Sequence, residues 1–178
     1  MPRIEKSIAI SAPAERVFEV LQQAESFAQF LPHVKQVQTL ERTESSVLLD
    51  WEVIAPGVGM PVRWRSRHTI DPANHRVAMQ PEGDALGQLN GDWRVQPEGA
   101  GSTLAAVIDY EANVPPMFAG MAQNAVNTII QDWLNGFKQC AVVVNPREAL
   151  VLIGQVAQGG QRVLHRQRAL CNLLQQQA

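Results

Sequence analysis

Four polar residues have the type and spacing to contact a ligand inside an apolar core. Ser66 and His68 lie two residues apart, so on a strand their side chains point to the same face. His68 could orient a ketone or quinone oxygen, or act as an acid or base, because an imidazole titrates near neutral pH. Tyr110, the only tyrosine, would need a partner or a ligand for a buried hydroxyl. Asp132, on a predicted helix, is a second candidate for acid–base chemistry.

The same residues also have structural interpretations, which we favour. A buried histidine with no second catalytic group beside it is more often a hydrogen-bonded core residue. Aspartate is rarely buried without a partner, so Asp132 is expected at a rim, facing an arginine. The sequence has no zinc motif, phosphate-binding glycine loop, nucleophile elbow or paired-carboxylate spacing. We therefore predict no metal, no cofactor and no catalytic residue, with His68 and Asp132 as weak candidates.

Seven segments have the pattern of β-strands and would position these residues. The first covers residues 3–11, and the others cover 34–40, 47–53, 62–70, 76–80, 86–95 and 103–111. Their alternation puts Trp51, Trp64 and Trp93 on one inner face. The connections are too short for parallel crossovers, so the pattern predicts an antiparallel sheet.

Three helices complete the predicted domain. Two short ones follow the first strand, and a long amphipathic one covers residues 119–144, between Pro115-Pro116 and Asn145-Pro146. We predict that the sheet wraps the long helix. Its expected apolar stripe consists of Ala122, Ala125, Val126, Ile129, Trp133, Gly136, Phe137, Cys140 and Val144.

The functional site is expected between the sheet and the long helix. Trp133 on the helix would meet the three inward tryptophans of the sheet, which suggests a large interior volume lined by aromatic rings. Two apolar loops, residues 55–61 and 114–121, suit the mouth of such a volume or simple anchoring of loops. The predicted ligand-binding residues are Trp51, Trp64, Ser66, His68, Met79, Leu89, Gly91, Trp93, Tyr110, Ile129 and Trp133.

Composition excludes several other classes of partner. The 178 residues carry a net charge of −2, which gives no reason to expect nucleic acid or an anionic membrane. Arg63, Arg65 and Arg67 form a row on one strand, but Asp50 and Glu52 on its neighbour would pair with them. The sequence shows no signal peptide and no run of about 18 apolar residues. We expect a cytoplasmic protein with at most transient membrane contact.

The last part of the chain differs from the rest. Residues 145–178 read as two helices separated by Gly159-Gly160, with a basic stretch from Arg162 to Arg168. Such a helical extension needs a surface to cover its apolar stripe, within its own domain or on another subunit. We expect two units, residues 1–144 and 145–178, and consider a homodimer through the C-terminal helices.

Several short motifs, in this order and spacing, resemble the START-like SRPBCC superfamily, especially its polyketide-cyclase and coenzyme-Q-binding branch. They are residues 4–8 (IEKSI), 11–18 (SAPAERVF), 30–34 (FLPHV), 89–97 (LNGDWRVQP) and 101–104 (GSTL). The resemblance spans about residues 3 to 144 and implies an α+β helix-grip fold. In this fold a seven-stranded antiparallel sheet grips a C-terminal helix around a deep apolar tunnel.

The resemblance implies binding and transport, or sequestration, of a small hydrophobic molecule such as a lipid, quinone, isoprenoid or polyketide-like compound. One alternative is a cofactor-independent cyclase, aromatase or dehydratase that uses His68 and Asp132. This requires both side chains to converge on one point of the cavity. A second alternative is an interaction module that resembles the ribosome-association toxins, which a small cavity and an exposed apolar patch would favour.

Overall fold

The computed structural model describes residues 2–83, 88–111 and 114–143. One antiparallel sheet of seven strands has the order β1-β7-β6-β5-β4-β3-β2. Consecutive strands pair from β2 to β7, and β1 pairs with β7 at the other edge. The predicted sheet is confirmed. Its strands are β1 (Arg3–Ile10), β2 (Val34–Arg42), β3 (Ser46–Ile54), β4 (Pro61–Asp71), β5 (Arg76–Glu82), β6 (Gln88–Glu98) and β7 (Gly101–Glu111).

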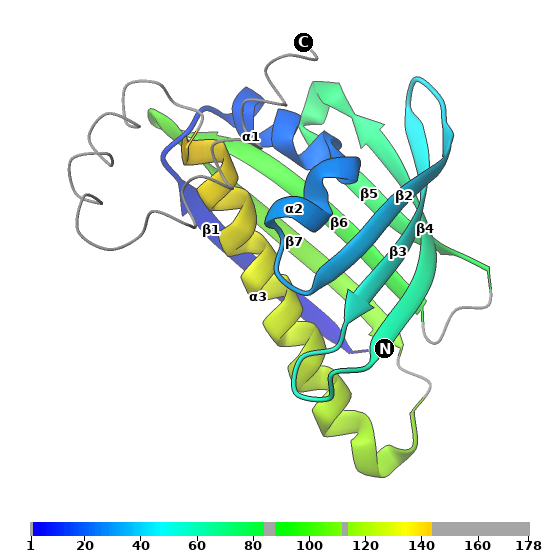
Figure 1. Ribbon diagram of the computed structural model, residues 1–178. Helices are drawn as coiled ribbons and strands as arrows, with labels where there is room; N and C mark the ends of the chain where they lie inside the picture. The colour runs from blue at the N-terminus through cyan, green and yellow to red at the C-terminus, as the bar shows by residue number, and fades with distance from the viewer. Residues whose placement is uncertain (1, 84–87, 112–113, 144–178) are drawn as a thin grey trace.

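The sheet curves around one long helix, α3 (Ala119–Val143), as Figure 1 shows. Two short helices after the first strand, α1 (Ala14–Gln22) and α2 (Phe27–Phe30), lie across one end of the sheet. A 3-10 turn, η1 (Ala24–Ser26), joins them, and two more precede β5 and α3, η2 (Pro72–Asn74) and η3 (Pro116–Phe118). The helix-grip architecture expected from the sequence is confirmed.

Burial alternates along most strands, and strictly along β7, which gives the sheet one buried face. On β7 the buried side chains are Ser102, Leu104, Ala106, Ile108 and Tyr110, and the residues between them are half-buried. The hydrogen-bond register places Trp93 beside Ala106, and Gly91 beside Ile108. Apolar residues at every second position therefore meet in rows across the concave side.

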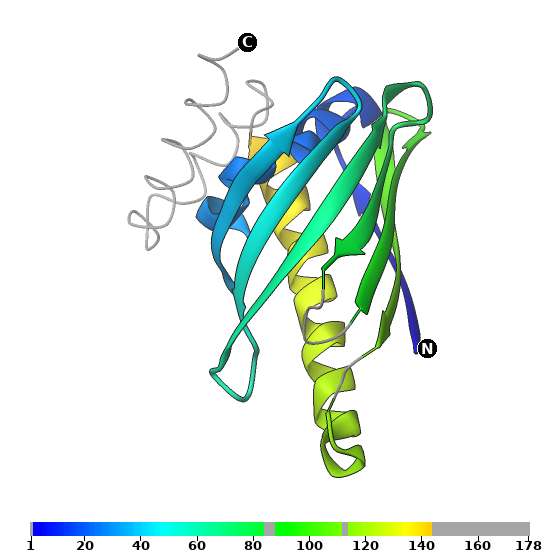
Figure 2. The same cartoon turned by 90° about the vertical axis from the view of Figure 1, so that its right-hand side faces the viewer.

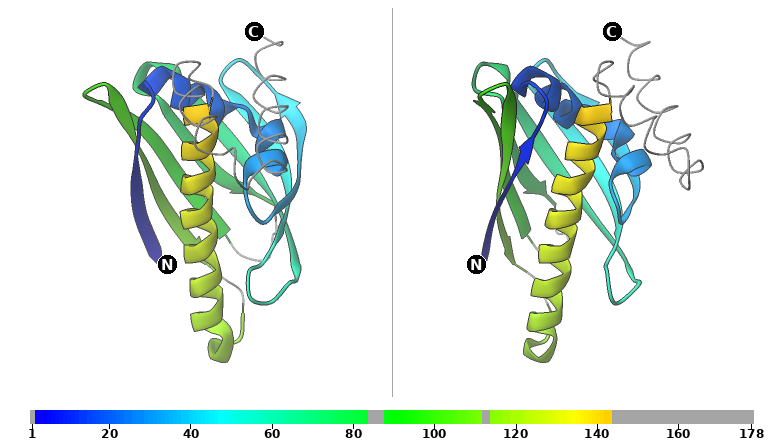
Figure 3. Two further views of the ribbon diagram at one scale, coloured as in Figure 1. Left: turned by 60° about the vertical axis from the view of Figure 1, so that its left-hand side comes forward. Right: turned by 90° about the vertical axis from the view of Figure 1, so that its left-hand side faces the viewer.

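The buried face of α3 is only partly the predicted one. Trp133, Gly136, Phe137 and Cys140 are buried as expected, but Ile130, Leu134 and Ala141 join them. The predicted members Ala122, Ala125, Val126 and Ile129 are only half-buried. Figures 2 and 3 show the reason, since the first turns of α3 project beyond the end of the sheet. A helical wheel gives the period of a stripe but not how far along the helix its partner extends.

Some predictions fall on other parts of the chain. Val144, the helical extension 145–178 and a homodimer through it lie outside the described residues. Within the described residues, no helix is both long enough and apolar enough to cross a membrane.

Candidate ligand-binding site

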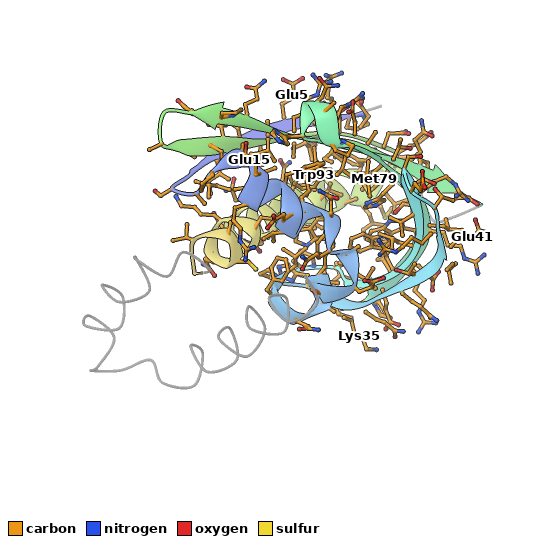
Figure 4. All side chains as sticks on the ribbon, turned by 90° about the horizontal axis from the view of Figure 1, so that it is seen from above. Glu5, Glu15, Lys35, Glu41, Met79 and Trp93 are labelled. Atoms are coloured by element: carbon orange, nitrogen blue, oxygen red, sulfur yellow. The ribbon has the colours of Figure 1, made fainter. Side chains whose placement is uncertain are left out.

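A group of parallel aromatic rings fills the middle of the fold. Trp51 on β3 stacks on Trp64, on His68 and on Trp133 of α3, with ring centroids 5.5 to 5.8 Å apart. Trp93 on β6 extends the group, with its centroid 6.5 Å from that of Trp133. Figure 4 shows Trp93 and Met79 inside the curve of the sheet. The predicted convergence of the four tryptophans is therefore present.

The space that these rings leave is small. They border a cavity of about 10 Å³, close to the volume that one water molecule needs. A large interior volume was expected, and the cavity between these rings is much smaller than that. The indoles of opposite elements stack on each other instead of lining separate walls. The residues around the cavity are Leu21, Phe27, Trp51, His68, Val77, Met79, Trp93, Trp133 and Phe137.

Five of the eleven predicted site residues line this cavity, namely Trp51, His68, Met79, Trp93 and Trp133. The other six do not line it: Trp64, Ser66, Leu89, Gly91, Tyr110 and Ile129. The selection missed Leu21, Phe27, Val77 and Phe137. All four belong to apolar patterns in the sequence, but nothing local distinguishes a core side chain from one beside a void.

Gly91 faces no free space at all. A Cβ at this position would lie 2.8 Å from Cε of Met79 and 3.0 Å from Cδ1 of Ile108. The glycine therefore lets two large side chains on neighbouring strands meet above the sheet. In this conformation the side chains of Met79 and Ile108 fill the space over Gly91 that a tunnel would need.

A short hydrogen-bond chain runs through the ring cluster. Nε1 of Trp51 donates to Oγ of Ser66 over 2.9 Å, and Oγ of Ser66 lies 3.0 Å from Nε2 of His68. An indole nitrogen can only donate, so the serine accepts from Trp51. Nε2 of His68 is the one other partner of this hydroxyl among the described residues, so the serine is assigned as the donor to Nε2. This assignment, made from the network, puts the imidazole proton on Nδ1. Nδ1 has no hydrogen-bond partner among the described residues.

His68 is neutral at physiological pH. Burial lowers the pKa of its imidazole from 6.5 to about 4, because the apolar surroundings penalise the charged form. The imidazole therefore offers one donor, Nδ1–H, at the cavity that it lines.

Two further donors of the inner face are unpaired. The hydroxyl of Tyr110 and Nε1 of Trp64 are buried and have no hydrogen-bond partner among the described residues. Burial raises the pKa of Tyr110, so its phenol keeps its proton and can donate. Arg16 and Gln23 also have an unpaired buried atom, but they belong to α1 and the connection after it. On the inner face of the sheet, the unpaired buried atoms are both donors.

Asp132 lies at the rim and not in the cavity. Its Oδ2 is 2.8 Å from Nε2 of His33, and the two side chains are 35% and 27% exposed. The rim position agrees with the structural interpretation, but the partner is a histidine instead of the expected arginine. His68 bonds to Ser66, so His68 and Asp132 have separate partners and share no contact that would make them an acid–base pair.

The segment before β2 is closely attached to α3. Nε1 of Trp133 donates to the carbonyl of Pro32 over 3.1 Å, one residue before the His33–Asp132 contact. His33 adopts a φ of 68°, a left-handed conformation that is unusual for a residue other than glycine. Gly136 allows the close approach, since a Cβ there would lie 2.9 Å from Cδ2 of Leu31. Sequence analysis did not select His33, whose only signal is its position in the FLPHV motif.

Comparison with known proteins assigns the family. The model of the family described as "Polyketide cyclase / dehydrase and lipid transport" matches residues 10–138. The chain belongs to this family. The resemblance inferred from the motifs is thus confirmed.

Two relatives of this chain are named for different activities. Over 112 residues it is 26% identical to the actinorhodin polyketide synthase bifunctional cyclase/dehydratase of Streptomyces coelicolor, covering 62% of this chain and 35% of that protein. It thus spans about a third of that relative's length. Over 136 residues it is 25% identical to the ribosome association toxin RatA of Pseudomonas aeruginosa, covering 72% of this chain and 92% of the toxin.

A solved structure supports the fold. The aromatase/cyclase ZhuI from Streptomyces sp. R1128 superposes with a TM-score of 0.73 and 22% identity, over 80% of this chain and 94% of that one. At this identity the likeness establishes the helix-grip fold and nothing further.

The convex face of this family member is covered by ion pairs. Arg63 bonds to Glu52 over 2.8 Å, and Arg65 lies 3.4 Å from Asp50, as the sequence predicted. Arg67 bonds instead to Glu82 and Glu41. Hydrogen bonds from Lys35 and then Arg63 hold the pKa of Glu52 below its usual value. The arginine row is thus already neutralised within the sheet. Among the described residues, no group of three or more His, Cys, Asp or Glu side chains could hold a metal ion.

Proposed function

We propose that this chain binds a small, flat, apolar molecule that carries hydrogen-bond-accepting oxygens, such as a quinone- or polyketide-like compound, between the sheet and α3. The observation that carries the proposal is a pair of buried donors on the inner face that have no hydrogen-bond partner among the described residues, the hydroxyl of Tyr110 and Nε1 of Trp64. His68, which lines the cavity, adds Nδ1–H in the tautomer assigned above. Buried polar groups are normally paired, and leaving one unpaired costs about 1 to 3 kcal/mol. A ligand oxygen would remove that cost.

The aromatic rings favour a flat ligand. Trp51 and Trp64 are parallel within 4°, and Trp51 and Trp133 within 20°. A planar ring system can replace one indole in such a stack and keep the same face-to-face contacts. The cavity of about 10 Å³ is too small as it stands, so binding requires at least one ring to move. Trp93 is the candidate, because Trp51 and Trp133 each donate a hydrogen bond from the indole nitrogen, whereas Trp93 donates none among the described residues.

Binding suits the geometry better than catalysis does. An acid–base reaction would need a second group near His68, but Asp132 is paired with His33 at the rim. Ser66 is fully buried, and its hydroxyl is engaged on both sides. The family description covers cyclases and dehydrases as well as lipid transport, so turnover of the bound molecule is the alternative.

A second candidate function, as an interaction module, is favoured by two observations. The cavity is small, and two loops expose large apolar side chains. The relative RatA, which this chain covers to 92%, is named for ribosome association. Mass spectrometry of a solvent extract of the purified protein separates the two functions, since a binder yields a defined compound near one equivalent and an interaction module yields none.

The binding proposal is tested with a matched pair of ligands, 9-fluorenone and fluorene, which share a ring system and differ by one carbonyl oxygen. Equilibrium dialysis should give at least tenfold tighter binding of 9-fluorenone, the effect of one good hydrogen bond to a buried donor. Replacing both His68 and Tyr110 by Phe should lower the affinity for 9-fluorenone to that for fluorene. Equal affinities of the wild-type protein for the two compounds would contradict the proposal.

A stability measurement provides the control for these variants. Tyr110→Phe removes a hydroxyl that has no partner, so the free energy of unfolding without ligand should stay the same or rise. Ser102→Ala removes a buried hydroxyl that donates to the carbonyl of Ala12 over 2.9 Å. It should cost about 1 kcal/mol and leave 9-fluorenone binding unchanged.

A further inference from the structure

Exposed apolar side chains are concentrated at one end of the molecule. Seven large hydrophobic side chains are exposed in the described part of the chain, and six of them lie on two segments. Val58 and Met60 are on the loop between β3 and β4, and Val114, Met117, Phe118 and Met121 are on the segment that leads into α3. The most exposed are Met117, at 82%, and Met60, at 61%. We call these six residues the apolar tip.

The two segments share one end because of the sheet topology. Strands β3 to β7 are consecutive and antiparallel, so β3 and β7 run in the same direction. The loop after β3 and the segment after β7 therefore leave the same edge of the sheet. Figure 2 shows both at the lower end, where the first turns of α3 project beyond the strands. Segments about sixty residues apart thus form one feature.

The apolar tip carries no charge. No Asp, Glu, Lys, Arg or His occurs from residue 53 to 62, or from residue 114 to 131. The convex face of the sheet is the opposite, since its carboxylates and guanidinium groups pair along the strands. The two segments themselves offer no charge to an anionic or cationic partner. The composition instead matches an electrically neutral, apolar environment.

We propose that the apolar tip docks this protein onto the surface of a lipid bilayer, by insertion of Met117, Phe118 and Met60 among neutral lipids. Methionine is flexible and adapts to an irregular, fluid surface. Two segments that project from the same edge of the sheet can each enter such a surface. Fluid hydrocarbon does not require a partner of complementary shape. Insertion of apolar side chains at an interface gives reversible binding whose strength grows with the buried area.

A second copy of the chain is a poorer occupant. A stable interface takes about 20 to 30 residues from each partner. The loop from residue 55 to 60 and the segment from 114 to 121 offer fourteen, on two projections instead of one flat patch. The inference goes beyond ligand binding and does not depend on it, since a docked protein need not hold a ligand.

Vesicle sedimentation tests the proposal with the full chain and phosphatidylcholine vesicles. The wild-type protein should sediment with the vesicles equally at 50 mM and 500 mM salt, because no charge contributes. The double variant Met60→Gln/Met117→Gln should lower the partition coefficient at least tenfold, since two apolar side chains no longer insert. Leu40→Gln is the matched control, since Leu40 is the one exposed large hydrophobic residue outside the tip and lies on edge strand β2. It should sediment like the wild type.

Three results would overturn the proposal. They are a wild-type protein that does not sediment with the vesicles, a wild-type protein that binds only anionic vesicles at low salt, and a double variant that binds as well as the wild type does. A concentration-dependent dimer that the double variant abolishes would assign the tip to a second copy. Measuring 9-fluorenone binding in the absence of vesicles separates this proposal from ligand binding. The double variant should still bind 9-fluorenone, because neither methionine lines the cavity. A double variant that loses 9-fluorenone binding but still binds vesicles would assign the tip to ligand access.

Discussion

At the scale of single residues, His68 is the titratable group whose surroundings differ most from water. The neutral imidazole accepts a hydrogen bond from Ser66 and lies against the indole of Trp51. A charged imidazole would lose solvation there and gain no counterion, which is why burial lowers its pKa to about 4. The same surroundings make it a donor at neutral pH and a poor general acid.

This depressed pKa predicts a pH dependence of stability. Below pH 6.5 the unfolded chain binds a proton at His68 while the folded chain does not, so the free energy of unfolding falls as the pH falls from 6.5 to about 4. The loss is at most about 3 kcal/mol. Urea unfolding at pH 7, 5.5 and 4.5 should show this slope for the wild type and a much smaller one for His68→Phe.

Over most of this pH range, the ion pairs of the convex face do not contribute to the expected change in the free energy of unfolding. The pKa values of Glu52, Glu82 and Asp92 are lowered from the ordinary values of 4.5 for glutamate and 3.8 for aspartate, so their contributions change mainly below pH 4.5. Parallel pH profiles for the wild type and His68→Phe would show that the imidazole is not buried in the neutral form.

At the scale of elements, the closure of the fold depends on how α3 meets the segment before β2. Three features meet within one turn of the helix: the bond from Trp133 to Pro32, the contact of Asp132 with His33, and the close approach at Gly136. His33–Asp132 is the one contact of α3 between a basic side chain and a carboxylate within residues 2–83, 88–111 and 114–143. The position of Trp133, and with it the size of the cavity, follows from this contact.

Two glycines on the same helix test this contact. In Gly136→Val the new side chain meets Leu31 and the carbonyl of Phe30, so we expect a loss of about 2 kcal/mol in the free energy of unfolding, typical of overpacking. Gly120→Val is the matched control, because a Cβ there meets nothing within 4 Å. Its stability should stay within about 0.5 kcal/mol of the wild type. Similar losses in the two variants would mean that the approach to Leu31 does not decide the result, since valine has a higher helix propensity than glycine.

At the scale of the whole molecule, the described part of the packed core lies within residues 4–142. Its members run from Ile4 on β1 to Val142 on α3. Residues 145–178 lie outside the described residues, so the division after residue 144 stays a prediction.

We expect a chain that ends at residue 144 to fold by itself, because the family model matches residues 10–138 and the described core runs from β1 to α3. We expect its circular dichroism spectrum to keep the strand signal, and its midpoint of thermal unfolding to lie within a few degrees of that of the full chain. Size-exclusion chromatography of the two proteins then tests the homodimer, since only the full chain should elute as a dimer. A truncated chain that aggregates or melts far below the full chain would contradict the division.

The sequence by itself determined the periodic features of this protein. Strand alternation set which side chains of β3, β4, β6 and β7 face inward, since the period of two leaves a single choice of face. Prolines and glycines marked the turns, and the short connections left only an antiparallel order. Pairing of Arg63 and Arg65 with Glu52 and Asp50 followed from the same alternation. All of these depend on neighbours within a few residues or on the adjacent strand.

Only the tertiary structure decided how much space remains inside. The volume between Trp51, Trp93 and Trp133 depends on side-chain rotamers and on the distance of α3 from the sheet, and Gly136 and Pro32 set that distance from far along the chain. Nor could spacing reveal that Asp132 would meet His33, 99 residues away. Whether Tyr110 and Trp64 find partners is likewise decided by packing. A residue's face is a local property, whereas a cavity is the small difference between a large enclosed volume and the side chains that fill it.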